Sequence, residues 1–329
     1  MTSIHPYAAL TPDLILDAVE SLGLRCDGHL LALNSYENRV YQIGMDDGAP
    51  LVAKFYRPQR WSDAQILEEH RFAAELLAEE IPVVAPLAFD GDTLLHWNGF
   101  RFALFPRRGG RAPELEDPQV LQWLGRFLGR IHLVGAAHDF AVRPTLDSYS
   151  FGHQSLTRIL ACPLLPAYLA PRYQAAAQQA LQQVDAAFAA LPDIRWLRSH
   201  GDCHTGNVMW TPDGPHFVDL DDSRMAPAVQ DLWMLLSGDR QQQAGQLAEL
   251  LAGYEDFAEF DYRELRLIEP LRTLRLMHYS AWLAARWDDP AFPAAFPWFG
   301  SEQYWLERIV ELEGQCAAMR EPPLFALPC

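Results

Sequence analysis

The pattern of apolar and polar positions changes about one third of the way along the chain. Before that point, short runs with strand character surround a single internal helix. Apolar residues at helical spacing follow Thr11-Pro12 and stop at Gly23, which predicts a first helix. The strand-like runs are His29–Leu33, Arg39–Ile43, Leu51–Phe55, Thr93–Trp97 and Phe100–Phe105.

Local signals sharpen this reading of the first third. Ser62 and Gln65 have the spacing of a capping box, so a helix should run from there to about Ala78. Asn98-Gly99 between two strand-like runs predicts a hairpin with a type I′ turn. Val83–Phe89 reads as extended chain.

Helical periodicity dominates after the stretch Pro106–Arg111, which has the composition of a linker. The predicted helices are Pro118–Val134, Pro166–Leu191, Val229–Leu236, Gln243–Phe257 and Glu264–Arg286. A single β interruption is expected, at Val208–Trp210 and His216–Leu220. We therefore predict an α+β, two-lobed, protein-kinase-like fold with a small β-rich N-lobe and a larger, mainly helical C-lobe. The expected boundaries are 1–105 for the nucleotide-binding lobe, 106–113 for the hinge and 114–329 for the catalytic and substrate lobe.

Charge and composition exclude several classes of function. The 329 residues carry a net charge of −17, which would repel nucleic acid. We expect no signal peptide and no membrane span, because no basic run precedes an apolar stretch and no apolar window is long enough. The five cysteines are odd in number and lack CxxC spacing, which favours free thiols in the cytoplasm. We also expect a monomer.

The segment from His200 to Asn207 carries the most informative polar residues. Asp202 and Asn207 lie on a glycine-containing loop before a strand, and the returning strand should bring Asp219 back beside Asn207. These hard oxygen ligands suit Mg²⁺, and Asp221 and Asp222 add negative charge nearby. Phosphoryl transfer from ATP needs such a metal site and a separate aspartate as base. We favour this kinase chemistry over the alternative, an acidic turn with solvated charges.

A zinc site is a weaker alternative for the same segment. His200, Cys203 and His204 could bind zinc, but a fourth ligand at suitable spacing is missing. His200 is better explained as a buried residue that packs the loop. Cys203 next to the predicted base could be oxidised, although a buried thiol with no basic neighbour is inert.

The β-rich part offers a lysine for the phosphates. Lys54 lies inside the apolar strand Leu51–Phe55, where a buried ammonium needs a carboxylate partner. Glu69 shares the inward helix face with Phe72, so it is the expected partner, with Glu68 as the alternative. Lys54 could instead lie on an edge strand with its amine in water. There is no glycine-rich loop, so the Ser35 hydroxyl and the backbone of the turn Asn34–Arg39 are the candidates for phosphate contact. An ordinary polar hairpin loop explains this turn equally well.

These strings resemble a known family. HGDCHTGN with FVDLDD resembles the catalytic and metal-binding loops of aminoglycoside and choline phosphotransferases. LNSYENRVYQ, VAKFYRP, QILEEH, PAVQDLWMLL and EPLR are similar to the stress response kinase A family of bacterial serine/threonine protein kinases, over roughly residues 10 to 325.

The resemblance implies a role for each matching position. Asp202 would be the proton acceptor, and Asn207 and Asp219 the Mg²⁺ ligands. Ser35 would lie at the ATP phosphates, Lys54 and Glu69 would form an ion pair, and Phe105-Pro106 would be the adenine-side hinge. Asp231 would brace the catalytic loop. The absence of a GxGxxG loop and of a DFG-to-APE segment argues against control by activation-loop phosphorylation.

Three functions remain open from the sequence. The first is an ATP- and Mg²⁺-dependent kinase acting in stress response on serine or threonine of proteins, including itself. The second is a small-molecule phosphotransferase for an amino alcohol or aminoglycoside, and the third is a nucleotide-binding scaffold without catalysis.

Several other residues could have either a functional or a purely structural role. Arg272 and Arg275 could reach or brace the acidic cluster, Arg107–Arg111 reads as a solvated loop, and the aromatic residues near the C-terminus, such as Trp282 and Trp298, read as lobe packing rather than as a substrate platform.

Overall fold

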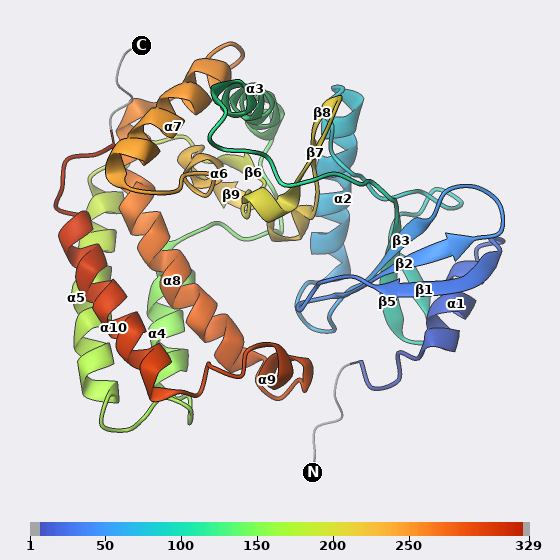
Figure 1. Ribbon diagram of the computed structural model, residues 1–329, viewed down its shortest axis with the longest axis horizontal. Coiled ribbons are helices and arrows are strands. Elements are labelled where there is room, and N and C mark those ends of the chain that lie inside the picture. The colour runs from blue at the N-terminus through green and yellow to red at the C-terminus, as the bar shows by residue number, and fades with distance from the viewer. Residues whose placement is uncertain (1–6, 325–329) are drawn as a thin grey trace.

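A five-stranded antiparallel sheet forms one end of the molecule and a helical body forms the other (Figure 1). This computed structural model describes residues 7–324, so the expectations for the first residues of the chain and for Cys329 lie outside the described residues. The sheet order is β1-β2-β3-β5-β4. Its strands are β1 (Cys26–Ala32), β2 (Arg39–Met45), β3 (Leu51–Phe55), β4 (Leu95–Trp97) and β5 (Phe100–Pro106).

Helices cover both faces of this sheet. Alternate residues of a strand point to opposite faces, and Ala53 and Phe55 accordingly belong to the core under α1 (Pro12–Glu20). Lys54 points to the other face, which is the face of α2 (Asp63–Ala78). The predicted capping box at Ser62 is formed, and Asn98 and Gly99 both have positive φ, as a type I′ turn requires.

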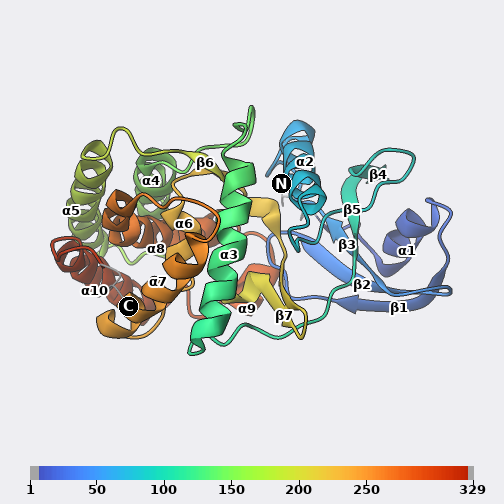
Figure 2. The same cartoon turned by 90° about the horizontal axis from the view of Figure 1, so that it is seen from above.

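The helical body has a small β element at its centre and longer helices around it. Figure 2 shows α2 between the sheet and α3. The helices are α3 (Pro118–Gly135), α4 (Gln154–Leu160), α5 (Ala170–Ala189), α6 (Val229–Trp233), α7 (Arg240–Tyr254), α8 (Ile268–Ala285), α9 (Ala291–Ala295) and α10 (Glu302–Ala318). Short helical turns of 3₁₀ or π type occur at Tyr149–His153, Thr205–Asn207, Leu220–Asp222 and Tyr262–Leu267.

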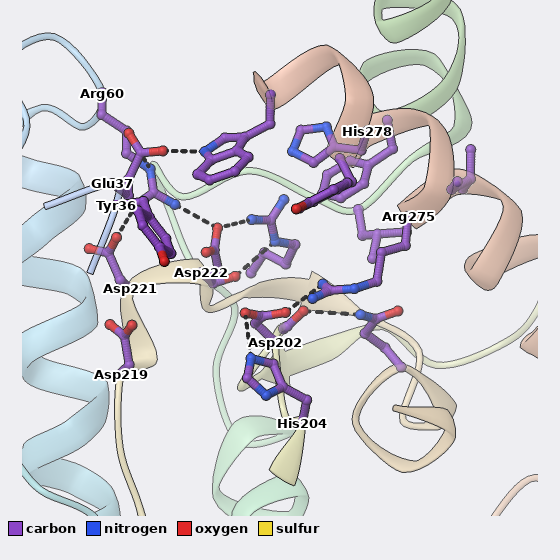
Figure 3. A pocket seen from close by; sticks show the side chains of 18 of the residues that line it. Tyr36, Glu37, Arg60, Asp202, His204, Asp219, Asp221, Asp222, Arg275 and His278 are labelled. Atoms are coloured by element: carbon purple, nitrogen blue, oxygen red, sulfur yellow. Dashed lines mark hydrogen bonds and ion pairs between the residues drawn. The ribbon is translucent and has the colours of Figure 1, made fainter. Parts of the chain in front are cut away.

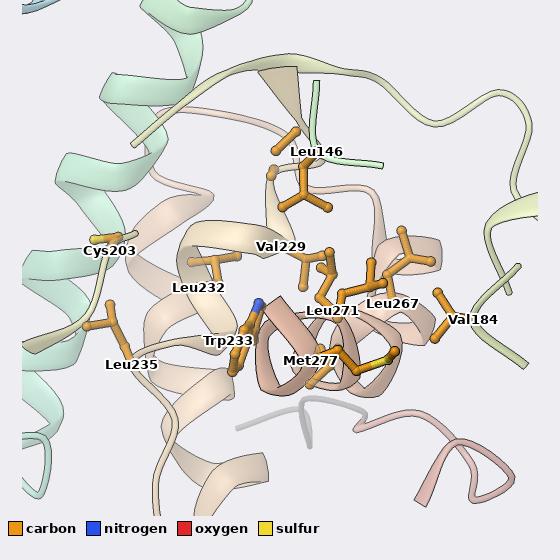
Figure 4. Packing of buried hydrophobic residues seen from close by; sticks show 14 of the residues in the cluster. Leu146, Val184, Cys203, Val229, Leu232, Trp233, Leu235, Leu267, Leu271 and Met277 are labelled. Atoms are coloured by element: carbon orange, nitrogen blue, oxygen red, sulfur yellow. The ribbon is translucent and has the colours of Figure 1, made fainter. Parts of the chain in front are cut away.

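The large core fixes α6 and α8 against the central element. Figure 4 shows Val229 and Trp233 of α6 beside Leu271 of α8, and Cys203 belongs to the same core. α3 and α7 approach so closely at Gly125 that a Cβ on this residue would lie 2.0 Å from the Leu250 carbonyl oxygen. The absence of a side chain at Gly125 therefore permits this contact. Burial of these apolar side chains is the main force that holds the helices in place.

The α+β, two-lobed fold and most predicted elements are confirmed, with one clear error. The hairpin of β7 (Val208–Thr211) and β8 (Gly214–Phe217) is accompanied by a second pair, β6 (Leu197–Ser199) and β9 (Arg224–Ala226), so the expected single β interruption is wrong. These three-residue strands are buried along their whole length, so their sequence shows no alternation. Cys26, Cys162, Cys203 and Cys316 are free thiols. Across residues 7–324, no helix is long and apolar enough to span a bilayer.

Candidate active site

The two β pairs bring two loops together at one end. The loop His200–Asn207 connects β6 to β7, and the loop Val218–Ser223 connects β8 to β9. Nε2 of His200 donates to the Val218 carbonyl at 2.9 Å, and the Val218 amide donates to the Asn207 carbonyl at 3.0 Å. Asp202 and Asp219 therefore come from different loops that are held in fixed register.

Asp231 supports the first loop from inside the core. Its carboxylate accepts the amide N–H groups of His200 at 2.7 Å and Gly201 at 2.9 Å, and it lies 3.1 Å from His132 Nε2. Asp231 has no exposed surface. Gly201 has φ +81°, and a Cβ there would lie 2.3 Å from the Asp222 carbonyl oxygen, so only glycine fits. The residue that follows this clamped pair is Asp202.

Both oxygens of Asp202 face positively polarised groups (Figure 3). Nη1 of Arg275, on α8, lies 2.5 Å from Oδ1, and Nε2 of His204 lies 3.6 Å from Oδ2. The Gly206 amide donates to His204 Nδ1 at 2.9 Å, so in the neutral ring the proton resides on Nε2 and points at Asp202. Burial lowers the pKa of His204, and the attraction of Asp202 opposes this only in part. The low pKa favours the neutral ring.

Asp219 lies at the start of the second loop in an unusual conformation. Its φ of 59° and ψ of 62° are left-handed, which is uncommon for a residue other than glycine. This backbone places Oδ1 2.8 Å from the Lys54 ammonium, with Asp221 Oδ1 3.3 Å from the same nitrogen. Burial alone would lower the pKa of Lys54, but Asp219, Asp221 and Glu69 outweigh it and hold that pKa above its ordinary value. The ammonium is therefore permanently charged.

The expected ion pair between Lys54 and Glu69 is not formed within the described residues. Glu69 is buried on the predicted helix face, but its nearest ion-pair contact is Arg143 at 3.9 Å, and its Oε2 has no hydrogen bond. The carboxylates of Asp219 and Asp221 take the place beside Lys54. Burial raises the pKa of Glu69 to about 7, while Lys54 opposes this. Glu68 is not the partner either, since it accepts the amides of residues 141 to 143.

The remaining carboxylates of the cluster are paired with arginines that sequence reasoning missed. Arg60 binds both Asp221 and Asp222, the latter at 2.8 Å, and Arg224 lies 2.7 Å from Asp222. Burial would raise the pKa of Asp221, but Arg60 and Lys54 lower it below its usual range. Guanidinium and ammonium groups thus balance the charge of these two aspartates.

The turn that carries Ser35 is tied to the helical body through Glu37. Its carboxylate accepts the indole N–H of Trp282, on α8, and Nε–H of Arg286, the residue after α8, the latter at 2.7 Å. It also lies 3.1 Å from Arg57. Asn38 is buried in the same turn and donates to Asp221 at 3.1 Å. Neither contact could be read from the sequence, because about 180 to 250 residues separate the partners.

Two cavities meet at Ser35 and Asp219. The first, the hinge-side cavity, has a volume of about 430 Å³ and combines apolar walls with Lys54 and Asn207. Its apolar lining includes Leu33, Val40, Val52, Val84, Phe105 and Leu220. The second, the α8-side cavity, has a volume of about 330 Å³ and contains Asp202. Both volumes fall in the range of small-molecule sites.

The structure thus assembles most of the predicted site residues. Ser35, Lys54, Glu69, Phe105, Asn207 and Asp219 line the hinge-side cavity. Asp202 lines the α8-side cavity with Arg275, whereas Arg272 turns away and pairs with Glu269 at 2.9 Å.

The side chains of Asn207 and Asp219 suit a divalent cation that other groups help to hold. Nδ2 of Asn207 donates to the Asp202 carbonyl at 2.9 Å, which turns the amide oxygen away from that bond. Asp219 is half exposed and keeps a second carboxylate oxygen beyond its bond to Lys54. Within residues 7–324, no three His, Cys, Asp or Glu side chains form a self-sufficient metal site. Mg²⁺ commonly uses one or two protein oxygens together with substrate phosphates.

Several other residues have the structural roles that the sequence analysis preferred over functional ones. His200 and Cys203 have no exposed surface, and burial raises the pKa of the Cys203 thiol. Phe292 and Trp305 are buried in the large core, whereas Trp282 also lines the α8-side cavity. Arg111 is exposed and pairs with Glu114 at 2.5 Å.

Comparison with known proteins gives a consistent picture. The phosphotransferase enzyme family matches residues 29–268. The chain is 47% identical to stress response kinase A of Escherichia coli over 326 residues, which cover 99% of this chain and 98% of the relative. It is 45% identical to the serine/threonine protein kinase RdoA of Salmonella typhimurium, covering 98% and 97% of the two chains.

Solved structures share the fold at low sequence identity. The amicoumacin kinase hAmiN superimposes with a TM-score of 0.73 at 19% identity, covering 96% of this chain and 95% of that one. A microcompartment-associated aminopropanol kinase gives a TM-score of 0.68 at 18% identity, covering 93% and 96%.

Proposed function

The chain belongs to the phosphotransferase enzyme family, within it to the stress response kinase A group, and we propose that it transfers the γ-phosphoryl group of ATP to serine and threonine hydroxyls of proteins. Phosphate transfer follows from the family, and the choice of ATP, Mg²⁺ and a protein acceptor is the proposal. One observation carries it: an apolar cavity with a buried lysine opens at Asp219 onto a second cavity that contains Asp202. Donor and acceptor would meet at this junction.

We assign the hinge-side cavity to the nucleotide. The adenine would lie between Val52, Val84 and Phe105, and its phosphates would reach Lys54 and the turn at Ser35. Lys54 brings a buried, permanently charged ammonium, which suits phosphate oxygens. Glu69 forms no ion pair with Lys54, but its negative charge helps to raise the pKa of Lys54. We therefore assign Glu69 an electrostatic role.

We assign the metal site to Asn207 and Asp219. When bound there, Mg²⁺ would neutralise negative charge on the transferring phosphoryl group. The left-handed backbone of Asp219 aims its carboxylate at the junction of the two cavities, and such uncommon conformations cluster at functional sites. Asp221 and Asp222, which are held by Arg60 and Lys54, shape the loop instead.

Asp202 is the proposed base. The acceptor oxygen forms a bond to the γ-phosphorus while the bond to the β-γ bridging oxygen breaks, ADP leaves, and the hydroxyl proton passes to Asp202. The clamp of Asp231 on the preceding residues fixes where this carboxylate lies. His204 and Arg275 orient its two oxygens.

The lobe boundaries and the location are part of the same proposal. Residues 1–105 would bind the nucleotide, 106–113 would be the hinge, and 114–329 would hold the catalytic loop and the acceptor. A cytoplasmic location is supported by the four free cysteines of the described chain.

The test is transfer of labelled phosphate from γ-labelled ATP. We expect phosphoserine and phosphothreonine on a protein acceptor and on the enzyme itself, and loss of at least about 100-fold in kcat for Asp202→Asn with ATP affinity retained. An Asp202→Asn enzyme with more than a tenth of the activity would exclude Asp202 as base. Absence of protein label together with rapid turnover of choline, an amino alcohol or an aminoglycoside would replace the protein acceptor with a small molecule. If no acceptor is phosphorylated, the remaining function is that of a nucleotide-binding scaffold without catalysis.

A further inference from the structure

One face of α8 forms a wall of the cavity that contains Asp202. Leu271, Arg275, His278 and Trp282 recur every three or four residues, so they share one side of the helix. Figure 3 shows Arg275 reaching from α8 to Asp202, with His278 one turn further along. An acceptor that presents its hydroxyl to Asp202 must therefore pass along this face.

The carboxylates that line this cavity already have basic partners. Each makes at least one ion pair with an arginine or lysine of the described chain. The pairs are Glu37 with Arg57 and Arg286, Asp202 with Arg275, Asp219 with Lys54, Asp221 with Arg60, and Asp222 with Arg60 and Arg224. A cationic acceptor would have to share a carboxylate with a basic group that already holds it, because none of the lining carboxylates lacks such a partner.

Arg275 has spare hydrogen-bonding capacity in the same cavity. Within residues 7–324, its single hydrogen bond joins Nη1 to Asp202 Oδ1, while a guanidinium has five N–H donors. Its side chain is 44% exposed, compared with 13% for Arg60 and 7% for Arg224. The polar group that this wall offers to an incoming acceptor is therefore a cation beside the base.

We propose that Arg275 binds an acidic side chain of the acceptor, so that the enzyme prefers serine or threonine residues flanked by aspartate or glutamate. This inference rests on the proposed function and specifies its substrate. Because Arg275 and Asp202 are in direct contact, the acid should lie within about two residues of the hydroxyl, since an extended chain advances roughly 3.5 Å per residue. An acid on Arg275 also competes for the guanidinium and leaves Asp202 Oδ1 to the hydroxyl.

The net charge of −17 works against an acidic substrate only at long range. At physiological ionic strength, exposed charges are screened over about 8 Å, so distant carboxylates contribute little to binding inside the cavity. The local pair therefore decides the preference. Arg275 acts as a specificity-determining and positioning residue, whereas Asp202 takes the proton.

The test uses pairs of serine peptides that differ only by aspartate or asparagine at positions −2, −1, +1 and +2. We expect about a tenfold preference in kcat/KM for the acid at one or more positions, as a charge-assisted hydrogen bond at a half-exposed site would give. Arg275→Gln should reduce that preference below about twofold, mainly by raising KM for the acidic peptide. Arg275→Glu should reverse it towards a lysine peptide.

Arg272→Gln is the matched control. Arg272 lies one turn before Arg275 on the same helix, pairs with Glu269 and Gln243, and lies outside the cavity lining. This variant should keep the acid preference. A thermal shift with Mg·ATP, which needs no acceptor, reports whether each variant is folded and binds nucleotide.

The outcomes separate the two proposals. If the wild type labels all peptides at equal rates, the proposed acid preference is wrong, whereas the proposed protein kinase function still holds. An acid preference that survives in a folded Arg275→Gln enzyme would also overturn it. If Arg275→Gln does not fold, Arg275→Lys must weaken the preference, and an unchanged preference there would again refute the role of Arg275. Turnover of small amino alcohols without any peptide label would defeat the proposed function itself.

Discussion

Replacement of Asp231 tests whether the core of the molecule positions the catalytic loop. Its carboxylate accepts the amides of His200 and Gly201 and contacts His132, with all three partners buried. Asp231→Ala leaves three buried donors without an acceptor. At about 1–2 kcal/mol each, the loss is about 3–6 kcal/mol. That is a large share of the total stability of about 5–15 kcal/mol of a typical domain.

Asp231→Asn is the more informative variant because it keeps the shape. The amide retains one acceptor oxygen but points its NH₂ at a backbone donor, so we expect a loss of about 2–3 kcal/mol. A shift of the first loop by about 1 Å would reduce kcat roughly 100-fold. The KM for ATP should change little, because Asp231 lies outside the lining of the hinge-side cavity.

Thr273→Val is the matched control for stability. Thr273 is equally buried and bonds to the Glu269 carbonyl at 2.8 Å and to Gln315, away from the loop. Both variants are compared by denaturant unfolding and by steady-state kinetics below their unfolding transitions. Asp231→Asn should lose kcat where Thr273→Val does not. Equal kcat in both variants, or less than a twofold loss in Asp231→Asn, would refute the positioning role.

Three further predictions concern the charged residues. A double-mutant cycle of Lys54→Met with Asp219→Asn should show a coupling free energy above about 0.5 kcal/mol in ATP affinity, because the two residues are in contact. This coupling should exceed that of the cycle of Lys54→Met with Glu69→Gln, and equal coupling in the two cycles would contradict the structure. Asn207→Ala and Asp219→Ala should remain folded and lose the part of the Mg·ATP thermal shift that depends on Mg²⁺, and an unchanged shift in both would exclude the metal assignment. Burial raises the pKa of Glu264 to about 7, so its proton stabilises the fold fully below about pH 4.5, and this contribution is lost as pH rises through 7. Between pH 5 and pH 8, the wild type should therefore lose at most about 3 kcal/mol of unfolding free energy relative to Glu264→Gln, and a difference that does not vary with pH would contradict the raised pKa.

Local signals in the sequence were sufficient for most of the secondary structure. The capping box at Ser62 and the turn at Asn98-Gly99 depend only on neighbouring residues, and both are present. The strands β6 and β9 were missed because their partners lie 25 to 29 residues apart and three buried residues show no period. The fold was therefore predictable where the determinants are local.

The candidate site divides in the same way. The segment from Asp202 to Asn207 and the returning Asp219 follow from hairpin geometry, which sequence spacing conveys. The helix face of Glu69 was also correct, since this residue is buried against the sheet. Its distance from Lys54 was not predictable, because a helix can slide or rotate by an ångström or two without changing its apolar pattern, and an ion pair does not tolerate such a shift.

The arginines that sequence reasoning missed connect the two ends of the molecule. Arg57 reaches Asp289 at 2.5 Å, Arg60 reaches Asp221, and Glu37 accepts from Arg286, so each pair joins the sheet side to the helical body. Buried ion pairs add little net stability, since desolvation offsets their attraction, but an unpaired buried charge is costly. A relative placement of the two ends that separated these pairs would leave buried charges without partners. The pairs therefore act mainly on alignment, and they hold the turn of Ser35 opposite the loop of Asp202, where phosphoryl donor and acceptor would have to meet.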